Sequence, residues 1–273
     1  MISVAQPQPP KTERRSRSDR RRSGSPEQFA ELAAAIEHGA IEVMFQPQYL
    51  SADGRVAGAE ALLRWDHPLQ GPLAGDLIFA MAHESGLAHR LAEHTCARAM
   101  DLAVRWPGDL RLSLNVTADD LADPGYPALL DAALHRSGFP AARLTLEITE
   151  QALVDGLDGA AQMLRHLTDK GIAIALDDFG AGFCNFRYLK TLPLAALKLD
   201  RSMVEGIATD RRDLAVFRAI MAMARALDLL VIAEGVETEA QRAAVVREGC
   251  DRWQGFLGAA PMTADAFAVL AAG

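Results

Sequence analysis

Residues 172–178 read IAIALDD, a short apolar run that ends in two aspartates. Alternate side chains of an extended strand point to the same face, so Ala173, Ala175 and Asp177 share one face of this run. Asp178 follows directly, where the chain leaves the strand. The stretch therefore predicts a strand whose charged groups gather at its C-terminal end.

The same arrangement recurs on both sides of this stretch. Apolar runs at 56–64, 110–115, 144–148, 196–200 and 229–234 also carry charged or amide groups on one face, at or near the C-terminal end. These groups are Glu60 and Arg64, Asn115, Glu147, Lys198 and Asp200, and Glu234. Barrel enzymes place their chemistry at this end of the strands, which points to one shared site.

The order of the elements predicts a (β/α)8 TIM-like barrel. Candidate strands at 41–46 and 250–254 bring the number of strands to eight. Helical patterns separate most of them, at 91–104, 126–135, 160–170, 213–227 and 239–248. A doubly wound open sheet is the alternative. The connection from Tyr49 to Arg55 is too short for a crossover helix, so we expect the first strand to pair antiparallel with the second.

The distribution of charge along the chain limits the kinds of ligand that the protein could bind. The formal net charge is -8, although residues 11–22 (KTERRSRSDRRR) hold seven basic and two acidic side chains. The rest of the chain is therefore strongly acidic, which argues against binding of DNA or RNA duplexes. An acidic body that binds an anionic substrate would need metal ions to invert its local field.

The N-terminal segment differs from the rest of the chain. Residues 1–25 are rich in Pro, Arg and Ser and lack apolar periodicity, so we expect a disordered tail before a single domain at 26–273. Ser25 is a plausible N-cap for a helix that starts at Pro26. A solvated leader is the favoured interpretation of the tail, and contact with a protein or a membrane surface is the alternative.

The expected compartment is the cytoplasm. Three cysteines, Cys96, Cys184 and Cys250, are odd in number and widely spaced, which favours a reducing environment. The N-terminus lacks the apolar region of a signal peptide. No apolar stretch approaches the ~20 residues that a membrane-spanning helix needs.

The clustered carboxylates predict a metal centre. A lone carboxylate in an apolar strand is usually a salt-bridged structural residue, but several close together resist ionisation unless cations lie between them. Every candidate ligand is an oxygen donor, which favours Mg²⁺ or Mn²⁺ over zinc. Two such ions about 3.5–4 Å apart are a common means of phosphodiester hydrolysis.

A series of short motifs runs through residues 27–273. They are FQP at 45–47, EAL at 60–62 followed by LRW at 63–65, HP at 67–68, ESGL at 84–87, NVT at 115–117, EITE at 147–150, DDFG at 177–180, KLD at 198–200, AEGVE at 233–237 and QG at 254–255. The tripeptide EAL alone carries little weight, whereas this many ordered motifs are specific. Together they resemble the EAL-domain family of cyclic di-GMP phosphodiesterases.

The resemblance implies hydrolysis of cyclic di-GMP to linear 5′-pGpG by a water that two Mg²⁺ or Mn²⁺ ions activate, in a protein that forms a homodimer. It implies ligands for the first metal at Glu60, Asn115, Glu147 and Asp177, and for the second at Asp177, Asp178 and Glu234. Glu60, Lys198 and Glu234 would be catalytic, with Lys198 on the attacking water or phosphate and Glu234 alternatively a general base. Substrate contacts would come from Gln46, Leu63, Arg64 and Gln254, and loop support from Glu150, Asp200 and Glu237.

Some of these residues also have simpler explanations. Arg64 could be an ion-pair partner of Glu60 or Asp177. Lys198 could form only a salt bridge with Asp200. Gln254 could satisfy backbone groups at the end of the last strand. We favour function for Arg64 and Lys198, and hold both interpretations open for Gln254 and for Gln46.

The loop after Asp178 departs from the family pattern. Family members commonly carry Thr, Tyr, Ser and Ser where this chain has Ala181, Phe183, Cys184 and Asn185. The departure favours an alternative function, a catalytically weak or inactive EAL domain that senses cyclic di-GMP or binds a protein. An unrelated metal-dependent barrel hydrolase or lyase would explain the carboxylates but not the ordered motifs.

Overall fold

Eight strands close into a barrel in the computed structural model, which describes residues 26–154, 156–182 and 185–273. The barrel strands are β1 (Ile41–Leu50), β2 (Val56–His67), β4 (Arg111–Val116), β5 (Leu144–Thr149), β6 (Ala173–Phe179), β7 (Ala196–Leu199), β8 (Leu230–Ala233) and β9 (Arg252–Trp253). Neighbouring strands from β2 through β9 are parallel, and β1 is antiparallel to both β2 and β9. The predicted closed barrel with an antiparallel first strand is confirmed, and the open sheet is wrong.

The structure extends two of the predicted strands and adds a short one. β1 continues through Pro47 to Leu50, and β2 continues past Arg64 to His67. β3 (Gly71–Ala74) pairs antiparallel with the end of β2. Four residues with a glycine and a proline are too few to show alternation, so the pattern did not predict β3.

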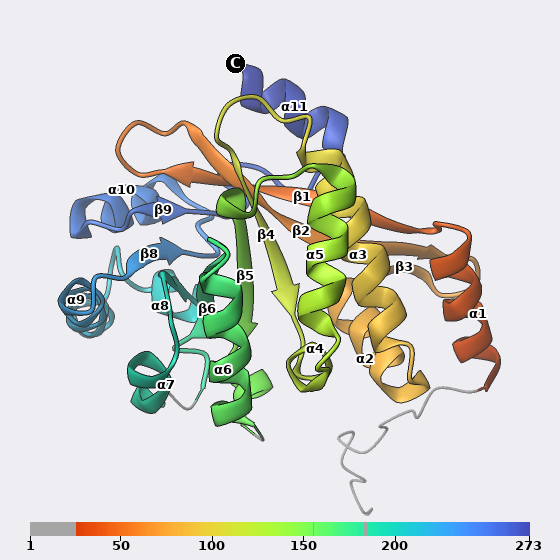
Figure 1. Cartoon of the computed structure of the whole chain (residues 1–273). Coiled ribbons are helices and arrows are strands. Elements are labelled where there is room, and N and C mark those ends of the chain that lie inside the picture. Colours follow the sequence, from red (N-terminus) through yellow and green to blue (C-terminus); the bar gives the residue numbers. More distant parts are fainter. Residues whose placement is uncertain (1–25, 155, 183–184) are drawn as a thin grey trace, which may run out of the picture.

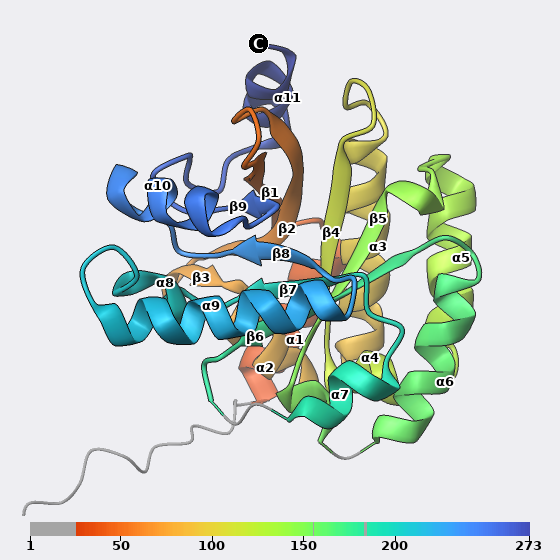
Figure 2. The same cartoon turned by 90° about the vertical axis from the view of Figure 1, so that its left-hand side faces the viewer.

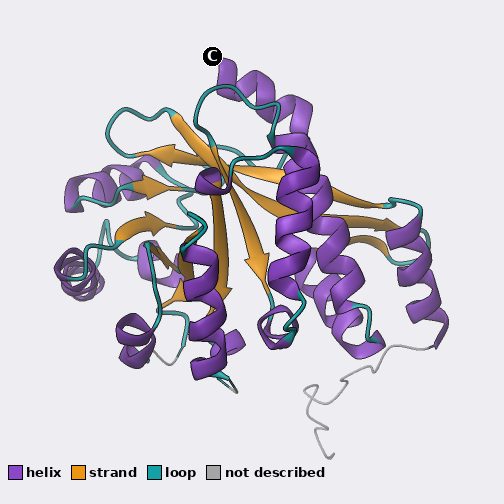
Figure 3. Cartoon of the chain, viewed as in Figure 1, coloured by secondary structure: helices purple, strands orange, loops and turns teal. Residues whose placement is uncertain are grey.

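Helices surround the barrel, as Figures 1 and 3 show. They are α1 (Pro26–Glu37), α2 (Gly75–Ser85), α3 (Ala88–Ala103), α4 (Ala118–Ala122), α5 (Tyr126–Ser137), α6 (Leu157–Thr168), α7 (Phe186–Thr191), α8 (Arg201–Glu205), α9 (Arg211–Ala226), α10 (Glu239–Glu248) and α11 (Ala264–Ala272). Short 3₁₀ turns lie at η1 (Ala141–Arg143) and η2 (Gln151–Leu153). The five helices predicted between strands correspond to α3, α5, α6, α9 and α10, and the helix predicted to start at Pro26 is α1. Within the described residues, no helix has both the length and the apolar character to span a membrane.

The two faces of the strands have different surroundings. Side chains such as Leu112 and Leu114 point outward and are buried in the main core with the helices. Ala175, Ala196 and Ile232 form a separate small cluster on alternate positions, together with the buried polar residues Ser113 and Thr145. The barrel interior is therefore narrow and partly polar.

Aromatic side chains pack the last helix against the outer face of β1. Phe45 of β1 lies 5.0 Å from Trp106 between ring centroids, and Trp106 lies 4.4 Å from Phe267 of α11. Figure 1 shows α11 at the end opposite the arrowheads of β4 and β5. Figure 2 shows the same end from the side, above α9 and α10. α11 therefore lies away from the end at which β4 and β5 terminate.

Candidate metal centre

Two overlapping groups of carboxylates meet at the C-terminal ends of the strands. Oxygens of Glu60, Glu147 and Asp177 lie within 4.8 Å of one another, and so do oxygens of Asp177, Asp178 and Glu234. Asp177 belongs to both groups. The tertiary structure thus brings together five of the predicted ligands from β2, β5, β6 and the end of β8.

An irregular backbone lets two consecutive aspartates reach this cluster. Successive strand residues normally point to opposite faces. The register between β6 and β7 shifts between Leu176 and Phe179, and Asp178 has a φ of 54°. Its backbone N–H donates to Oδ1 of Asp177 at 2.9 Å. Aspartate tolerates this left-handed conformation better than most residues do.

Lys198 lies at the centre of the cluster. Its Nζ is 2.5 Å from Oε2 of Glu147, 2.8 Å from Oε1 of Glu234, 3.0 Å from Oδ2 of Asp177 and 3.4 Å from Oε2 of Glu60. Burial disfavours the ammonium, but the surrounding carboxylates raise the pKa of Lys198 well above its ordinary value. A simple Lys198–Asp200 salt bridge is wrong: Asp200 instead caps α8, accepting from the N–H of Ser202 at 2.9 Å.

The carboxylates differ in how easily they ionise. Burial raises the pKa of Glu147 to about 8, and the charges of Glu60 and Asp177 add to this effect. Burial and Asp177 likewise raise the pKa of Asp178 to about 6. Burial also raises the pKa of Glu234 well above its usual range. One ammonium is therefore too little positive charge for this cluster, which fits a site for additional cations.

Glu60 is the exception because hydrogen-bond donors surround it. Burial opposes its ionisation, yet Lys198, Gln254 and Asn115 together lower the pKa of Glu60. Asn115 Nδ2 donates to Oε1 at 2.8 Å, and Gln254 Nε2 donates to Oε2 at 2.7 Å. Gln254 Nε2 also lies 3.5 Å from Oε1 of Gln46. Gln254 thus contacts side chains of the cluster and not strand-end backbone groups.

An open cleft of about 720 Å³ lies above the cluster. Its lining includes five carboxylates, Glu60, Asp76, Asp177, Asp178 and Glu234, but only two cations, Arg64 and Lys198. An anionic substrate would be repelled from such a cleft unless cations bound first.

Arg64 and Leu63 lie on opposite faces of β2. Arg64 is half-buried at the cleft, and its Nη1 donates to the carbonyl of Leu63 at 2.8 Å. Among the described residues it forms no ion pair with Glu60 or Asp177, so the structural alternative for Arg64 is wrong in this form. The Leu63 side chain is buried in the core, and the residue also borders the cleft.

The loop after β6 is tied to β5 at one described point. The backbone N–H of Asn185 donates to Oε2 of Glu150 at 3.3 Å. The Asn185 side chain caps α7 by accepting from the N–H of Arg187 at 3.0 Å. Phe183 and Cys184 lie outside the described residues. Asn185 therefore supplies a helix cap at the position where the family commonly has a serine.

Sequence reasoning missed Gln48. Its side chain is 1% exposed inside the barrel, and Nε2 lies 3.5 Å from Oε1 of Glu147. Gln48 is two residues after Gln46 and so on the same face of β1. The signal was present, but the predicted first strand ended at Gln46 and so did not include Gln48.

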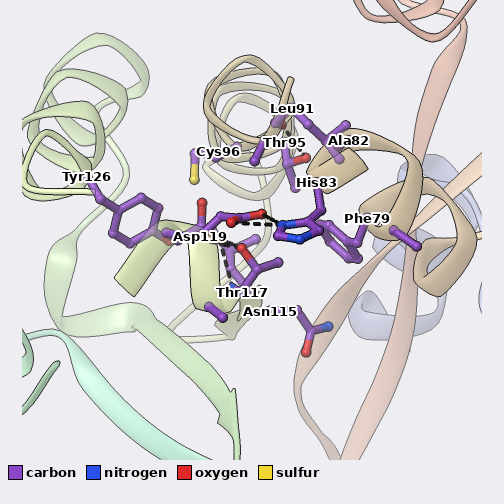
Figure 4. A pocket seen from close by; sticks show the side chains of 16 residues that line it. Phe79, Ala82, His83, Leu91, Thr95, Cys96, Asn115, Thr117, Asp119 and Tyr126 are labelled. Carbon is purple, nitrogen blue, oxygen red and sulfur yellow. Dashed lines mark hydrogen bonds and ion pairs between the residues drawn. The ribbon is translucent and has the colours of Figure 1, made fainter. Parts of the chain in front are cut away.

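A second cavity of about 340 Å³ lies beside the cluster, between α2, α3 and α4. Figure 4 shows its mostly apolar lining, to which Asn115 also belongs. His83 and Asp119 pair across its rim at 2.8 Å. Apart from Asn115, no predicted ligand lines this cavity, so the acidic chemistry belongs to the open cleft.

The fold and the site define a class: a closed α/β barrel with a carboxylate-rich centre at the C-terminal ends of its strands. The family model of the EAL domain matches residues 30–261, and the chain belongs to the EAL domain family. The buried acidic cluster is typical of the metal site of that family.

Relatives and solved structures agree with this assignment. The chain is 38% identical over 239 residues to the cyclic di-GMP phosphodiesterase NbdA of Pseudomonas aeruginosa, covering 85% of this chain and 30% of the relative. It is 35% identical over 239 residues to the bifunctional diguanylate cyclase/cyclic di-GMP phosphodiesterase MucR of the same organism, covering 86% and 35%. It is 37% identical over 236 residues to an uncharacterized signaling protein of Caulobacter vibrioides, covering 86% and 29%. The chain thus spans about a third of the length of these relatives.

The structure of the PaMucR phosphodiesterase in complex with c-di-GMP superposes with a TM-score of 0.82 at 35% identity, covering 88% of this chain and 99% of that one. The EAL enzyme Bd1971, bound to cAMP and cyclic di-GMP, gives a TM-score of 0.83 at 27% identity, covering 90% and 68%.

Proposed function

We propose that this chain hydrolyses cyclic di-GMP to linear 5′-pGpG with the help of two divalent cations. Water would add across one of the two phosphodiester bonds, leaving a 5′-phosphate and a free 3′-hydroxyl. The observation that carries the proposal is the pair of carboxylate groups that share Asp177 at the floor of an open cleft. Such overlapping groups suit two ions bridged by one carboxylate.

The oxygen donors suit Mg²⁺ or Mn²⁺. Glu60, Asn115, Glu147 and Asp177 would hold the first ion, and Asp177, Asp178 and Glu234 the second. When bound, the cations would supply an activated water and neutralise the phosphate. Asn115 Nδ2 bonds Glu60 at 2.8 Å, which leaves its side-chain oxygen available as a ligand.

The remaining cleft residues would bind and orient the substrate. Arg64 offers a guanidinium whose fork suits a phosphate oxygen pair. Lys198 would contact the attacking water or the phosphate once cations take over its carboxylate partners. Gln46 and Gln254, which lie beside each other, would complete the dinucleotide pocket with Leu63. Glu234 is the most exposed carboxylate in contact with Lys198, at 16%, so it could also accept the proton of the water.

The loop residues have supporting roles in this proposal. Glu150 would hold the loop after Asp178, and Asp200 would fix the start of α8 by its cap. Glu237 would fix the loop after β8. We also propose that the protein forms a homodimer and is located in the cytoplasm. The domain at 26–273 would function without the basic tail. The partner of the tail would be a protein or a membrane surface.

A cyclic di-GMP sensor remains the second candidate. The loop departures at Ala181 and Asn185 favour it, because a less ordered loop would hold Asp178 less firmly. The complete ligand set favours the enzyme.

The test is incubation of purified protein with cyclic di-GMP and Mg²⁺ or Mn²⁺, with and without EDTA, followed by chromatography. The proposal expects pGpG only when metal is free to bind. Tight binding of cyclic di-GMP without any pGpG in either metal would assign the chain to the sensors.

A further inference from the structure

The segment that carries Glu234 is held by the end of β7 and by the first residue of α8. β8 ends at Ala233, so Glu234 lies beyond the last hydrogen-bonded strand residue. Its N–H donates to the carbonyl of Leu199 at 3.0 Å, and its carboxylate lies 2.8 Å from Nζ of Lys198. These contacts hold Glu234 on the barrel side. In the turn that follows, the N–H of Val236 donates to the carbonyl of Gln254 at 3.1 Å, and the N–H groups of Glu237 and Thr238 donate to Oε1 of Gln241 at 2.9 Å. These bonds hold the backbone of the turn but not the Glu237 carboxylate.

Arg201 holds the other side of this turn. Its Nη1 lies 2.9 Å from Oε1 of Glu237, and its Nε lies 2.8 Å from Oε1 of Glu205 one helical turn further along α8. Glu205 thus fixes the guanidinium, and the guanidinium fixes Glu237. The carboxylates of Glu234 and Glu237 are anchored three residues apart to the same short segment, Lys198 through Arg201.

The aliphatic stem of Arg201 packs directly on Gly235. A β-carbon at position 235 would lie 2.5 Å from Cγ and 2.6 Å from Cβ of Arg201, closer than such atoms can approach. Gly235 also has a φ of 63°, which favours glycine. The close contact therefore depends on both residues, and it sits next to the Glu234 backbone.

We propose that Arg201 is a positioning residue for the second metal site, acting through Gly235 and Glu237 to set the reach of Glu234. The inference rests on the proposed two-metal function. Exposed ion pairs add little to folding stability, since their charges are solvated in either state. Groups that orient a metal ligand nevertheless change metal affinity by about 10–100-fold when removed. The Arg201 pair should therefore affect metal binding far more than stability.

Arg218 provides a matched control. It lies on α9, its side chain is 59% exposed against 53% for Arg201, and its Nε and Nη2 bond Glu248 at 2.7 and 3.0 Å. Among the described residues, Glu248 neither lines the open cleft nor belongs to the carboxylate cluster, so we expect it to have no role in metal binding. Arg218→Ala thus removes an ion pair whose arginine is about as exposed as Arg201, without touching the Glu234 segment. Its partner Glu248 is more buried, at 9% exposure, and also lies 3.2 Å from Arg247.

The experiment titrates the full chain with Mn²⁺ in the absence of substrate and monitors binding by calorimetry or electron paramagnetic resonance. It compares the wild type with Arg201→Ala, Arg201→Lys, Glu237→Gln and Arg218→Ala. Hydrolysis of cyclic di-GMP at saturating and limiting Mn²⁺ is measured in parallel. For Arg201→Ala we expect about tenfold weaker binding of the second ion, at the lower end for an orienting group, and lost activity that excess Mn²⁺ partly restores. Glu237→Gln should resemble it, Arg201→Lys should fall between, and Arg218→Ala should match wild type. The thermal unfolding midpoint of Arg201→Ala should stay close to that of wild type and should be no lower than that of Arg218→Ala, whose partner is more buried.

Equal second-site affinity in Arg201→Ala and Arg218→Ala would overturn the inference, while hydrolysis by the wild type would leave the proposed function standing. A wild type that binds fewer than two Mn²⁺ and forms no pGpG would overturn the proposed function, and this inference with it.

Discussion

Asp178 donates its backbone N–H to the side chain of the residue before it, Asp177, at 2.9 Å, and does so with a φ of 54°. This left-handed residue turns the second carboxylate into the cluster that the first already reaches. We expect Asp178→Asn to keep the fold and lose second-site metal binding, because asparagine tolerates the conformation but lacks the charge. Activity should fall at least about a hundredfold, as for other residues that act directly at the metal.

Asp228 provides a control that distinguishes the cost of backbone strain from the loss of a metal ligand. It is exposed, also has a φ of 54°, and lies at the end of α9 away from the cleft. Asp178→Ala and Asp228→Ala should each cost about 1 kcal/mol of stability for the left-handed conformation, measured by urea unfolding. Only the change at Asp178 should abolish metal binding. Full activity in Asp178→Asn would contradict the second metal site.

Substitution of Glu60 and substitution of Glu147 should have opposite effects on the stability of the metal-free protein. Glu60 accepts hydrogen bonds from the part-buried Asn115 and the buried Gln254, so Glu60→Ala removes the acceptor of both side chains and should destabilise by roughly 1–3 kcal/mol. Glu147 has its pKa raised to about 8, so Glu147→Gln removes a poorly tolerated charge and should leave the unfolding midpoint at pH 8 unchanged or higher. Both variants should lack activity. A large loss of stability in Glu147→Gln would mean that its bond to Lys198 outweighs the repulsion.

Metal affinity should rise with pH. Glu147, with a pKa of about 8, and Asp178, with a pKa of about 6, hold protons in the metal-free protein over part of the range from pH 6 to 8. A cation must displace those protons, so affinity is lost as pH falls through these values. We expect Mn²⁺ to bind at least about tenfold more weakly at pH 6 than at pH 8 by calorimetry. Proton release should show as a dependence of the binding enthalpy on the buffer.

The same groups make the metal-free protein less stable as pH rises. A carboxyl whose pKa is raised in the folded state binds more protons there than when unfolded, so unfolding becomes easier as pH increases from about 4.5 to 8. Lys198 stays charged throughout, because its pKa is raised and not lowered. The unfolding midpoint without metal should therefore be higher at pH 6 than at pH 8. Glu147→Gln should reduce the difference between the unfolding midpoints at pH 6 and pH 8.

Two cysteines should be unreactive in the folded protein. Burial, aided by Asp120, raises the pKa of Cys96 to about 12, and burial with Asp251 raises that of Cys250 to about 12. At pH 8 each thiol would then be ionised to only about one part in ten thousand. A Cys184→Ser variant should show no fast thiol in a colorimetric assay until denaturant is added. Rapid labelling of either cysteine in the native state would show that its surroundings open readily.

Deletion of residues 1–24 should leave turnover in solution nearly unchanged. The segment has no apolar pattern for docking and carries none of the predicted site residues. The measurement compares specific activity and Mn²⁺ affinity of the truncated and full chains. A clear loss in folded truncated protein would indicate that the basic tail reaches the cleft or a dimer contact.

The sequence by itself determined the barrel and most of the centre. Alternation within each strand assigned Glu60, Glu147, Asp177 and Lys198 to inward faces, and parallel strands necessarily end at one rim. That inference needs only local periodicity and the direction of each strand. It failed where the local pattern was too short or interrupted, at β3 and at Gln48.

Only the tertiary structure decided which groups touch. Gln254 reaches Glu60 across 194 residues of sequence because β1 closes the barrel between β9 and β2. Lys198 of β7 reaches Glu147 of β5 across 51 residues, past the intervening strand β6. The left-handed Asp178 and the packing of Arg201 on Gly235 likewise depend on neighbouring strands and loops. Periodicity in the sequence places a side chain on one face of its strand. The distance from that side chain to a charge on another strand depends on barrel closure, on strand stagger and on the path of the loops. No single segment of the sequence encodes these features.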